Sequence, residues 1–235
     1  MIRLSKRLAA IGALVTQGNT LADIGCDHGY LPIDLIQKQR IPRAIAMDVR
    51  SGPLSRARKN IEAYGLLDYI EVRMSNGLEA LKPGEAQTVT IAGMGGPLME
   101  EILKKGAGPL ASVQELIVQP QSEIEHFRRF LRKLPFTAAD EDMVEEDGKY
   151  YPMMRLTAGE PKDHWEEPDY RYGKYLLRER HPVLKKYLHR EKEKLEKLEE
   201  SLRLADSISA AKRLEQIRQE KRYVQEALKT YEFDV

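Results

Sequence analysis

Residues 4–134 alternate between short apolar runs and longer stretches in which apolar positions recur every three or four residues. Short apolar runs bounded by turn residues are typical of buried strands, and the three-to-four spacing is typical of helices. The predicted strands span residues 20–25, 44–48, 69–73, 88–92 and 115–118, and the predicted helices span residues 4–17, 30–38, 54–64, 97–103 and 122–134. This alternation predicts an α/β fold with a parallel sheet covered on both faces.

The pattern changes at residue 136. Residues 136–144 and 149–156 are both strand-like, and the acidic segment between them ends in Gly148. Two strands joined by a short glycine turn form an antiparallel hairpin, so we expect a hairpin to close one edge of the sheet. Residues 157–171 are rich in proline and glycine and are predicted to be a linker or docking segment.

From residue 182 onward the pattern is purely helical. Apolar residues recur in alternating steps of four and three, which is the seam of a coiled coil, and two polar residues, Glu191 and Lys221, fill gaps in it. Folding the second half back on the first around residues 204–208 places these two residues opposite each other. We therefore predict an antiparallel helical hairpin marked by a Glu191–Lys221 pair. The seam consists of Leu184, Leu188, Leu195, Leu198 and Leu202, followed by Ala210, Leu214, Ile217, Val224, Leu228 and Tyr231.

The chain thus divides into a domain over residues 1–160 and a helical domain with its linker over residues 161–235. Its single cysteine, Cys26, excludes an internal disulfide, and its five histidines lack short metal-ligand spacing. No apolar run approaches the roughly 18 residues of a membrane span, and no signal peptide is recognisable. We expect a complete, cytoplasmic protein with no metal and no membrane contact. Because the helical seam closes on itself, we also expect a monomer.

The turn after the first predicted strand carries the clearest chemical signal. Its residues follow the pattern DxGxDxG, from Asp23 through Gly25 and Asp27 to Gly29. Glycine at a strand-to-helix turn lets the backbone approach a ligand closely. The dinucleotide fingerprint GxGxxG would need glycine at Asp27 and Tyr30, so NAD and FAD are disfavoured. An acidic turn suits a ligand with an ammonium group, and the motif resembles the first motif of class I S-adenosylmethionine-dependent methyltransferases.

Three further segments end predicted parallel strands and are expected to meet the turn at one crevice. Asp48 is placed to accept the ribose hydroxyls, Asn76 to read an adenine edge, and the slim backbone of residues 92–97 to admit a substrate base. The alternatives are a glycine turn, a capping aspartate and an ordinary Asn-Gly turn. The candidate cofactor-binding residues are Asp23, Gly25, Asp27, His28, Gly29, Asp48, Asn76, Gly77, Gly93 and Met94.

Five segments together resemble the bacterial tRNA adenine-22 N1-methyltransferase family. They are Leu4–Leu8, Asp23–Pro32, Ile91–Gly96, Val118–Pro120 and Lys149–Pro152, and the resemblance extends over essentially the whole chain. It implies a Rossmann-like class I methyltransferase domain, a C-terminal α-helical coiled-coil domain, S-adenosyl-L-methionine as the methyl donor, and tRNA methylated in its D-arm.

Adenine N1 carries an in-plane lone pair, so methylation there needs no prior removal of a proton. Residues 93–96 accordingly hold neither an aspartate nor the Asn-Pro-Pro-aromatic motif of enzymes that methylate exocyclic amines. We expect catalysis by positioning rather than by a general base. Tyr30 could equally be a core aromatic, Met94 a packing residue, and residues 119–120 a strand terminator. The candidates for the catalytic end of the site are Asp27, Tyr30, Met94, Gln119 and Pro120.

The net charge of +1 gives no general attraction for nucleic acid, so any RNA contact must come from local basic clusters. Binding through phosphates predicts a steep salt dependence. The competing interpretations are a class I methyltransferase for another RNA, a protein or a small molecule, and a non-catalytic nucleoside-binding module. The candidate tRNA-binding residues are Lys6, Arg7, Arg56, Arg58, Lys59, Arg128 and Arg129.

Overall fold

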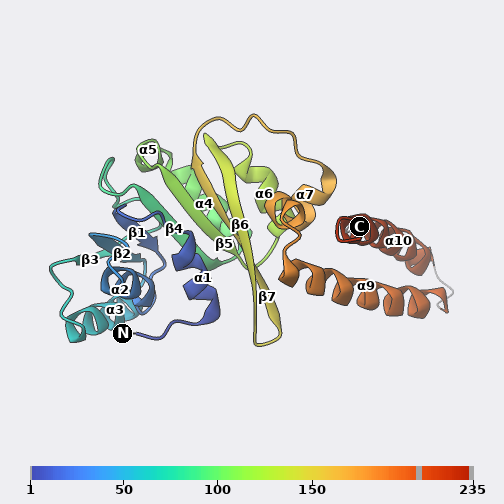
Figure 1. Cartoon of the computed structure of the whole chain (residues 1–235), viewed down its shortest axis with the longest axis horizontal. Coiled ribbons are helices and arrows are strands. Elements are labelled where there is room, and N and C mark those ends of the chain that lie inside the picture. Colours follow the sequence, from blue (N-terminus) through green and yellow to red (C-terminus); the bar gives the residue numbers. More distant parts are fainter. Residues whose placement is uncertain (1, 205–207, 233–235) are drawn as a thin grey trace. The chain divides into compact units, whose positions relative to one another are not determined.

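The computed structural model describes residues 2–204 and 208–232, which form two compact units divided between Asp163 and His164. The first unit is built on a seven-stranded sheet with the order β3-β2-β1-β4-β5-β7-β6 (Figure 1). Its strands are β1 (Leu21–Ile24), β2 (Ala44–Asp48), β3 (Ile70–Met74), β4 (Thr88–Met94), β5 (Glu115–Pro120), β6 (Phe136–Glu146) and β7 (Lys149–Ala158). Strands β1 to β5 are parallel, as the sequence predicts.

Helices cover both faces of this sheet because its strands are apolar on both sides. Alternate residues of one strand enter different cores: Leu21 packs with residues of α1, α2 and α3, whereas Ala22 packs with residues of α4, α5 and α6. The helices are α1 (Lys6–Leu14), α2 (Tyr30–Gln37), α3 (Ser51–Ala63), α4 (Gly96–Lys105), α5 (Ala107–Leu110) and α6 (Ile124–Leu131). The short α5 was not predicted, since it follows α4 after a single glycine.

Strands β6 and β7 form an antiparallel hairpin that pairs with β5 through β7. Their turn is tighter than the predicted acidic segment, because Glu145 and Glu146 still belong to the ladder. Only Asp147 and Gly148 turn the chain, with φ of 50° and 70°, as a two-residue hairpin turn requires. Helix α1 packs beside this hairpin (Figure 1). The hairpin reaches the start of α1, where a Glu146 carboxylate oxygen accepts a hydrogen bond of 2.7 Å from the Lys6 backbone N–H.

The second unit is helical. It contains α7 (Glu167–Tyr172), α8 (Lys174–Arg178), α9 (Pro182–Arg203) and α10 (Ile208–Lys229), and α9 packs along α10. The predicted linker is therefore partly wrong: α7 begins inside it, and Trp165 is buried against the Tyr170 ring. The two series of seam residues are largely buried, with Leu188 and Ile217 fully so. The predicted turn lies partly at residues 205–207, outside the described residues, and the predicted register of the seam stays a prediction.

The predicted Glu191–Lys221 pair is wrong. The Lys221 ammonium instead lies 2.6 Å from a carboxylate oxygen of Glu199, and Glu191 pairs with Lys194 on its own helix. Side chains on a helix lean toward its N-terminus, so in an antiparallel pair Lys221 and Glu199 lean toward each other. Glu199 is 6% exposed, so it is a buried charged residue of this interface.

Among the described residues, no helix is long and apolar enough to cross a membrane.

Candidate functional site

A cleft of about 390 Å³ opens at the carboxyl ends of the parallel strands, a volume in the range of small-molecule sites. It brings together the ends of β1, β2 and β4 with the segment after β3, as the sequence predicts. The lining residues are Arg7, Ile24, Gly25, Asp27, Asp48, Val49, Arg50, Ser75, Asn76, Gly77, Ala92, Gly93, Met94, Leu98, Ile102 and Gln121.

Gly25 makes the floor of the cleft possible. Its φ is +76°, a left-handed conformation that disfavours a side chain, and a Cβ built there would lie 2.3 Å from the Met94 methyl carbon. The first turn and the end of β4 therefore approach each other through the missing side chain. The predicted cofactor residues Gly25, Gly93 and Met94 meet at this point.

Asp48, the last residue of β2, is 5% exposed and forms one wall. One of its carboxylate oxygens accepts a hydrogen bond of 2.9 Å from the Arg50 backbone N–H, which fixes the side chain. Next to it, Val49 is 57% exposed, and Leu98 across the cleft is 50% exposed. These two apolar walls are not among the residues predicted from the sequence. For Val49 the sequence did contain a signal. It is an apolar residue directly after Asp48, the acid that ends the strand, at a position where burial is not expected.

Asn76 and Gly77 line the cleft from the segment after β3. The Asn76 amide donates to Glu79, and the Ser75 hydroxyl donates to the Gly77 carbonyl at 2.8 Å, so the turn is held from both sides. A Cβ on Gly77, whose φ is +60°, would stand 2.9 Å from an Ile102 side-chain carbon. This glycine therefore lets the turn lie against α4.

Asp23 lies beneath the turn rather than in the cleft. Asp23 is 6% exposed, and its carboxylate accepts a hydrogen bond of 2.7 Å from the Thr90 hydroxyl. Burial raises the pKa of Asp23 to about 6, against the lowering effect of the Thr90 hydrogen bond. Burial, with the nearby Asp23 carboxylate, also raises the pKa of the Cys26 thiol. Asp23 thus supports the turn from below.

Asp27, His28 and Tyr30 lie in or directly after the turn that follows β1. Asp27 lines it, and one of its oxygens lies 3.3 Å from the Arg56 guanidinium. His28 and Tyr30 stack with ring centroids 5.1 Å apart, and neither lines the cleft. Tyr30 is 36% exposed, so it is not a core aromatic. Gly29 precedes α2 with φ of +70° and packs against α3 instead of the cleft.

Gln119 and Pro120 are buried at the end of β5 and do not line the cleft. Both residues pair with β4, Gln119 opposite Ala92 and Pro120 opposite Met94, whereas the pairing of β5 with β7 ends at Val118. The Gln119 side chain accepts a hydrogen bond of 3.1 Å from the Arg7 guanidinium and donates to the Pro120 carbonyl. The expectation that these two residues clamp a base directly is therefore wrong; Gln119 acts on the cleft through Arg7.

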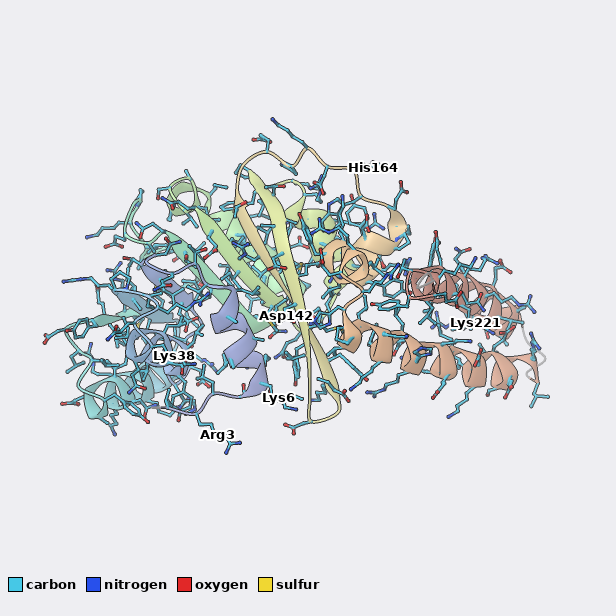
Figure 2. All side chains as sticks on the ribbon, in the orientation of Figure 1. Arg3, Lys6, Lys38, Asp142, His164 and Lys221 are labelled. Atoms are coloured by element: carbon cyan, nitrogen blue, oxygen red, sulfur yellow. The ribbon has the colours of Figure 1, made fainter. Side chains whose placement is uncertain are left out.

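The candidate tRNA-binding residues differ in their surroundings. Lys6, Arg56 and Lys59 are exposed, and Figure 2 shows the Lys6 side chain on the outside of α1. Arg58 is exposed but lines a different pocket, with Arg43 and Tyr69, at the opposite edge of the sheet. It therefore lies away from the cleft.

Of the two candidates on α6, Arg128 is wrong as a phosphate contact because it is buried, whereas Arg129, with a side chain 38% exposed, stays a prediction. The Arg128 side chain is 1% exposed and pairs with Glu141, and Arg129 pairs with Glu125 one turn earlier. Neighbouring arginines on a helix point in different directions, so a basic run in the sequence need not be a basic surface.

Among the described residues, no cluster of histidine, cysteine, aspartate or glutamate is suited to hold a metal ion.

Comparison with known proteins gives a consistent result. The sequence model of a family described as tRNA (adenine(22)-N(1))-methyltransferase matches residues 21–232. The Bacillus subtilis (strain 168) protein of that description is 40% identical over 159 residues, which cover 68% of this chain and 67% of that protein.

Two solved structures match over nearly their whole length. Streptococcus pneumoniae Sp1610 in complex with S-adenosyl-L-methionine has a TM-score of 0.85 and 36% identity, covering 96% of this chain and 100% of that one. M. capricolum TrmK in complex with S-adenosyl-homocysteine has a TM-score of 0.82 and 27% identity, covering 97% of this chain and 98% of that one.

Proposed function

The chain belongs to the tRNA (adenine(22)-N(1))-methyltransferase family, and we infer that it transfers a methyl group from S-adenosylmethionine to N1 of adenine 22, in the D-arm of tRNA. The observation that carries this function is the cleft at the carboxyl ends of β1, β2 and β4, where an acid on β2 faces a glycine turn. This is where an open α/β sheet binds its ligand.

The residues of the cleft fit S-adenosylmethionine. The Asp48 carboxylate is positioned by the Arg50 N–H and suits a pair of ribose hydroxyls, while Val49 and Leu98 provide apolar surface for an adenine ring. A side chain at Gly25 would displace Met94 into the space of a ligand. Asp27, also in the lining, provides a negative charge for an ammonium group.

The bound cofactor supplies an electrophilic methyl group, which leaves sulfur and bonds to adenine N1 while the positive charge passes from sulfur to the base. No proton is lost in this step, so the chain needs to position the two reactants and keep water away. Gly93 and Met94 form the β4 side of the cleft. There the acceptor base would lie beside the donor, with the exposed Tyr30 ring, three residues after Asp27, available for stacking.

Exposed cations near the mouth would bind tRNA phosphates. Lys6 on α1 and Arg56 and Lys59 on α3 are exposed, and Arg56 adjoins the cleft through its contact with Asp27. The charged surfaces of the second unit would add to this grip. We further propose that the chain acts as a monomer in the cytoplasm.

The deciding experiment combines the protein with methyl-labelled S-adenosylmethionine and an unmodified tRNA transcript that has adenine at position 22. Nucleoside analysis is expected to find 1-methyladenosine, and a transcript with guanine at position 22 should receive none. Another methylated nucleoside, or equal transfer to both transcripts, would contradict the proposed site. Cofactor binding without transfer to any RNA would indicate a non-catalytic binding module.

A further inference from the structure

A second pocket lies at the amino ends of the strands whose carboxyl ends form the cofactor cleft. This amino-end pocket has a volume of about 510 Å³, and its lining includes the residues directly before β1, β2 and β3, which are Thr20, Arg43 and Tyr69. Arg58 lines it from α3. A volume of this size is in the range of sites that hold a ligand as large as a nucleotide.

The two arginines of the amino-end pocket are free to bind a ligand. Arg43 and Arg58 are exposed, and in the described part of the chain neither guanidinium forms an ion pair or a hydrogen bond. A guanidinium is a planar fork of N–H donors that matches the oxygens of a phosphate. Two such forks in the lining of one pocket provide the donors and the charge that a phosphate group needs.

The acidic residues of the amino-end pocket are mostly engaged within the protein. Glu71 and Glu85 share one partner, Arg73, whose nitrogens lie 2.8 and 2.6 Å from their carboxylate oxygens. The hydrogen bonds from Arg73 lower the pKa of both carboxyls. Asp68 is the remaining acid of the lining. The charged groups of the lining without a partner are therefore two cations and one anion, a balance that favours an anionic ligand.

Tyr69 adds an aromatic surface beside these cations. It is 51% exposed, and its backbone is fixed by the sheet, because its carbonyl accepts a hydrogen bond of 2.9 Å from the Ala44 N–H. An exposed aromatic ring on a rigid support is a surface on which a nucleic-acid base can stack. Tyr69 also lines a neighbouring cavity of about 570 Å³, whose apolar lining residues include Ile36, Ile41, Pro42 and Leu66.

We propose that the amino-end pocket binds a second nucleotide of the tRNA substrate, away from adenine 22, with its phosphate at Arg43 and Arg58 and its base against Tyr69. The inference rests on the proposed function and adds a second contact site to it. It also gives Arg58 a role in tRNA binding at a place other than the cofactor cleft.

One tRNA molecule can reach both sites. Strand β2 begins in the amino-end pocket with Ala44 and ends in the cofactor cleft with Asp48. Its five residues span about 16 Å. This length is less than half of the roughly 34 Å that one turn of a nucleic-acid duplex spans. A tRNA with adenine 22 in the cleft therefore extends far enough to place another nucleotide at the amino ends of the strands.

The test measures the Kd of an unmodified tRNA transcript at several salt concentrations. Arg43→Gln and Arg58→Gln should each raise this Kd about three- to tenfold. Each should also reduce the slope of log K against log salt by about 0.7–0.9, the effect of one lost phosphate contact. Arg43→Lys should keep the slope, because it keeps the charge. Tyr69→Ala should raise the Kd without changing the slope, since stacking releases no counterions.

The chain offers a matched control for each kind of variant. Lys105→Gln removes an exposed charge on α4 that already pairs with Glu101 at 2.6 Å. Tyr64→Ala removes a tyrosine that is 42% exposed and lines neither cavity. Both controls should change the Kd of tRNA less than about twofold. In every variant the Kd of S-adenosylmethionine, measured by calorimetry, should stay within about twofold of wild type, because the amino-end pocket and the cofactor cleft share no lining residue.

An unchanged Kd of tRNA and an unchanged slope in both Arg→Gln variants would overturn the proposal and leave the pocket to a protein or a small molecule. Losses of affinity as large in Lys105→Gln and Tyr64→Ala would also overturn it, because they would not depend on the pocket. If the wild-type protein does not methylate adenine 22, the proposed function fails and this inference with it. If it does, and the arginine variants bind tRNA as wild type does, only the second contact site fails.

Discussion

The guanidinium of Arg128 on α6 and the carboxylate of Glu141 on β6 form an ion pair inside the first unit, with 3.0 Å between Nε and Oε1. The two side chains are 1% and 0% exposed. Removing one partner from a buried pair leaves the other charge without its compensation. This pair ties the edge hairpin, which carries Glu146, to the helices behind the sheet.

Arg128→Met is therefore expected to lower the free energy of unfolding by about 3–5 kcal/mol. Arg129→Met, whose partner Glu125 is partly exposed, should cost less than about 1 kcal/mol. Urea unfolding followed by circular dichroism measures both. Similar decreases in the free energy of unfolding in the two variants would mean that burial of the Arg128–Glu141 pair does not increase the cost of removing its arginine.

Gly25→Ala should weaken binding of S-adenosylmethionine, because the added methyl group would meet Met94 in the cleft. We expect a rise in Kd of about tenfold or more. Gly18→Ala is the control: its φ is +90° and nothing lies within 4 Å of the added carbon, so it has backbone strain without the contact. Calorimetry gives both affinities. A comparable loss of binding in Gly18→Ala would attribute the effect to backbone strain alone.

Asp27→Asn tests the mechanism without a general base. Of the two carboxylates that line the cleft, Asp27 is the exposed one, and it contacts Arg56. Loss of a general base lowers kcat by about 10²–10⁴-fold. We expect kcat to fall less than about tenfold, with the main effect on the KM of S-adenosylmethionine. Steady-state kinetics at saturating cofactor gives the answer, and a loss of kcat in the general-base range would refute the mechanism.

Asp23 should make the stability of the first unit depend on pH. Burial raises the pKa of Asp23 from 3.8 to about 6, so the folded protein holds this proton more tightly than the unfolded chain does. Its contribution to stability is therefore complete below pH 4 and is lost as the pH rises through 6.

Asn does not titrate, so Asp23→Asn removes this loss of stability at higher pH. Between pH 4 and pH 7, its free energy of unfolding should increase relative to that of wild type by on the order of 2–3 kcal/mol. Denaturant unfolding at several pH values measures the difference. Asp68→Asn, at an exposed carboxyl, controls for the removal of one charge. A difference between Asp23→Asn and wild type that stays flat with pH would show that the carboxyl titrates normally.

Glu199 gives the second unit a pH dependence of opposite sign. Hydrogen bonds from Lys221 and then Arg203 lower the pKa of Glu199 from 4.5 to about 2. The stabilisation is present above pH 4.5 and is lost as the pH falls toward 2. The Tm of Glu199→Gln should lie below that of wild type at pH 7, and the gap should narrow in acid. Glu193→Gln, at an exposed site on the same helix, should show no such narrowing; a constant gap for Glu199→Gln would contradict the assignment.

Much of the fold could be predicted from local patterns. Asp48 was placed at the end of its strand, and Gly25 at a ligand-facing turn, because strand length and glycine position are local properties. The cleft could also be anticipated, since the carboxyl ends of parallel strands share one edge of the sheet. Residues such as Val49 and Leu98 were missed, because their exposure depends on what packs around them.

The sequence by itself determined the alternation of strands and helices, the helical seam of the second unit and the residues that end β1, β2 and β4. The tertiary structure decided which charges have partners. It buried Arg128 against Glu141, gave Lys221 to Glu199 instead of Glu191, and brought Arg7 from the first helix to the end of the fourth strand. Periodicity reports which side of an element is apolar, but the partner of a long polar side chain depends on how distant elements pack, and only the folded chain shows this.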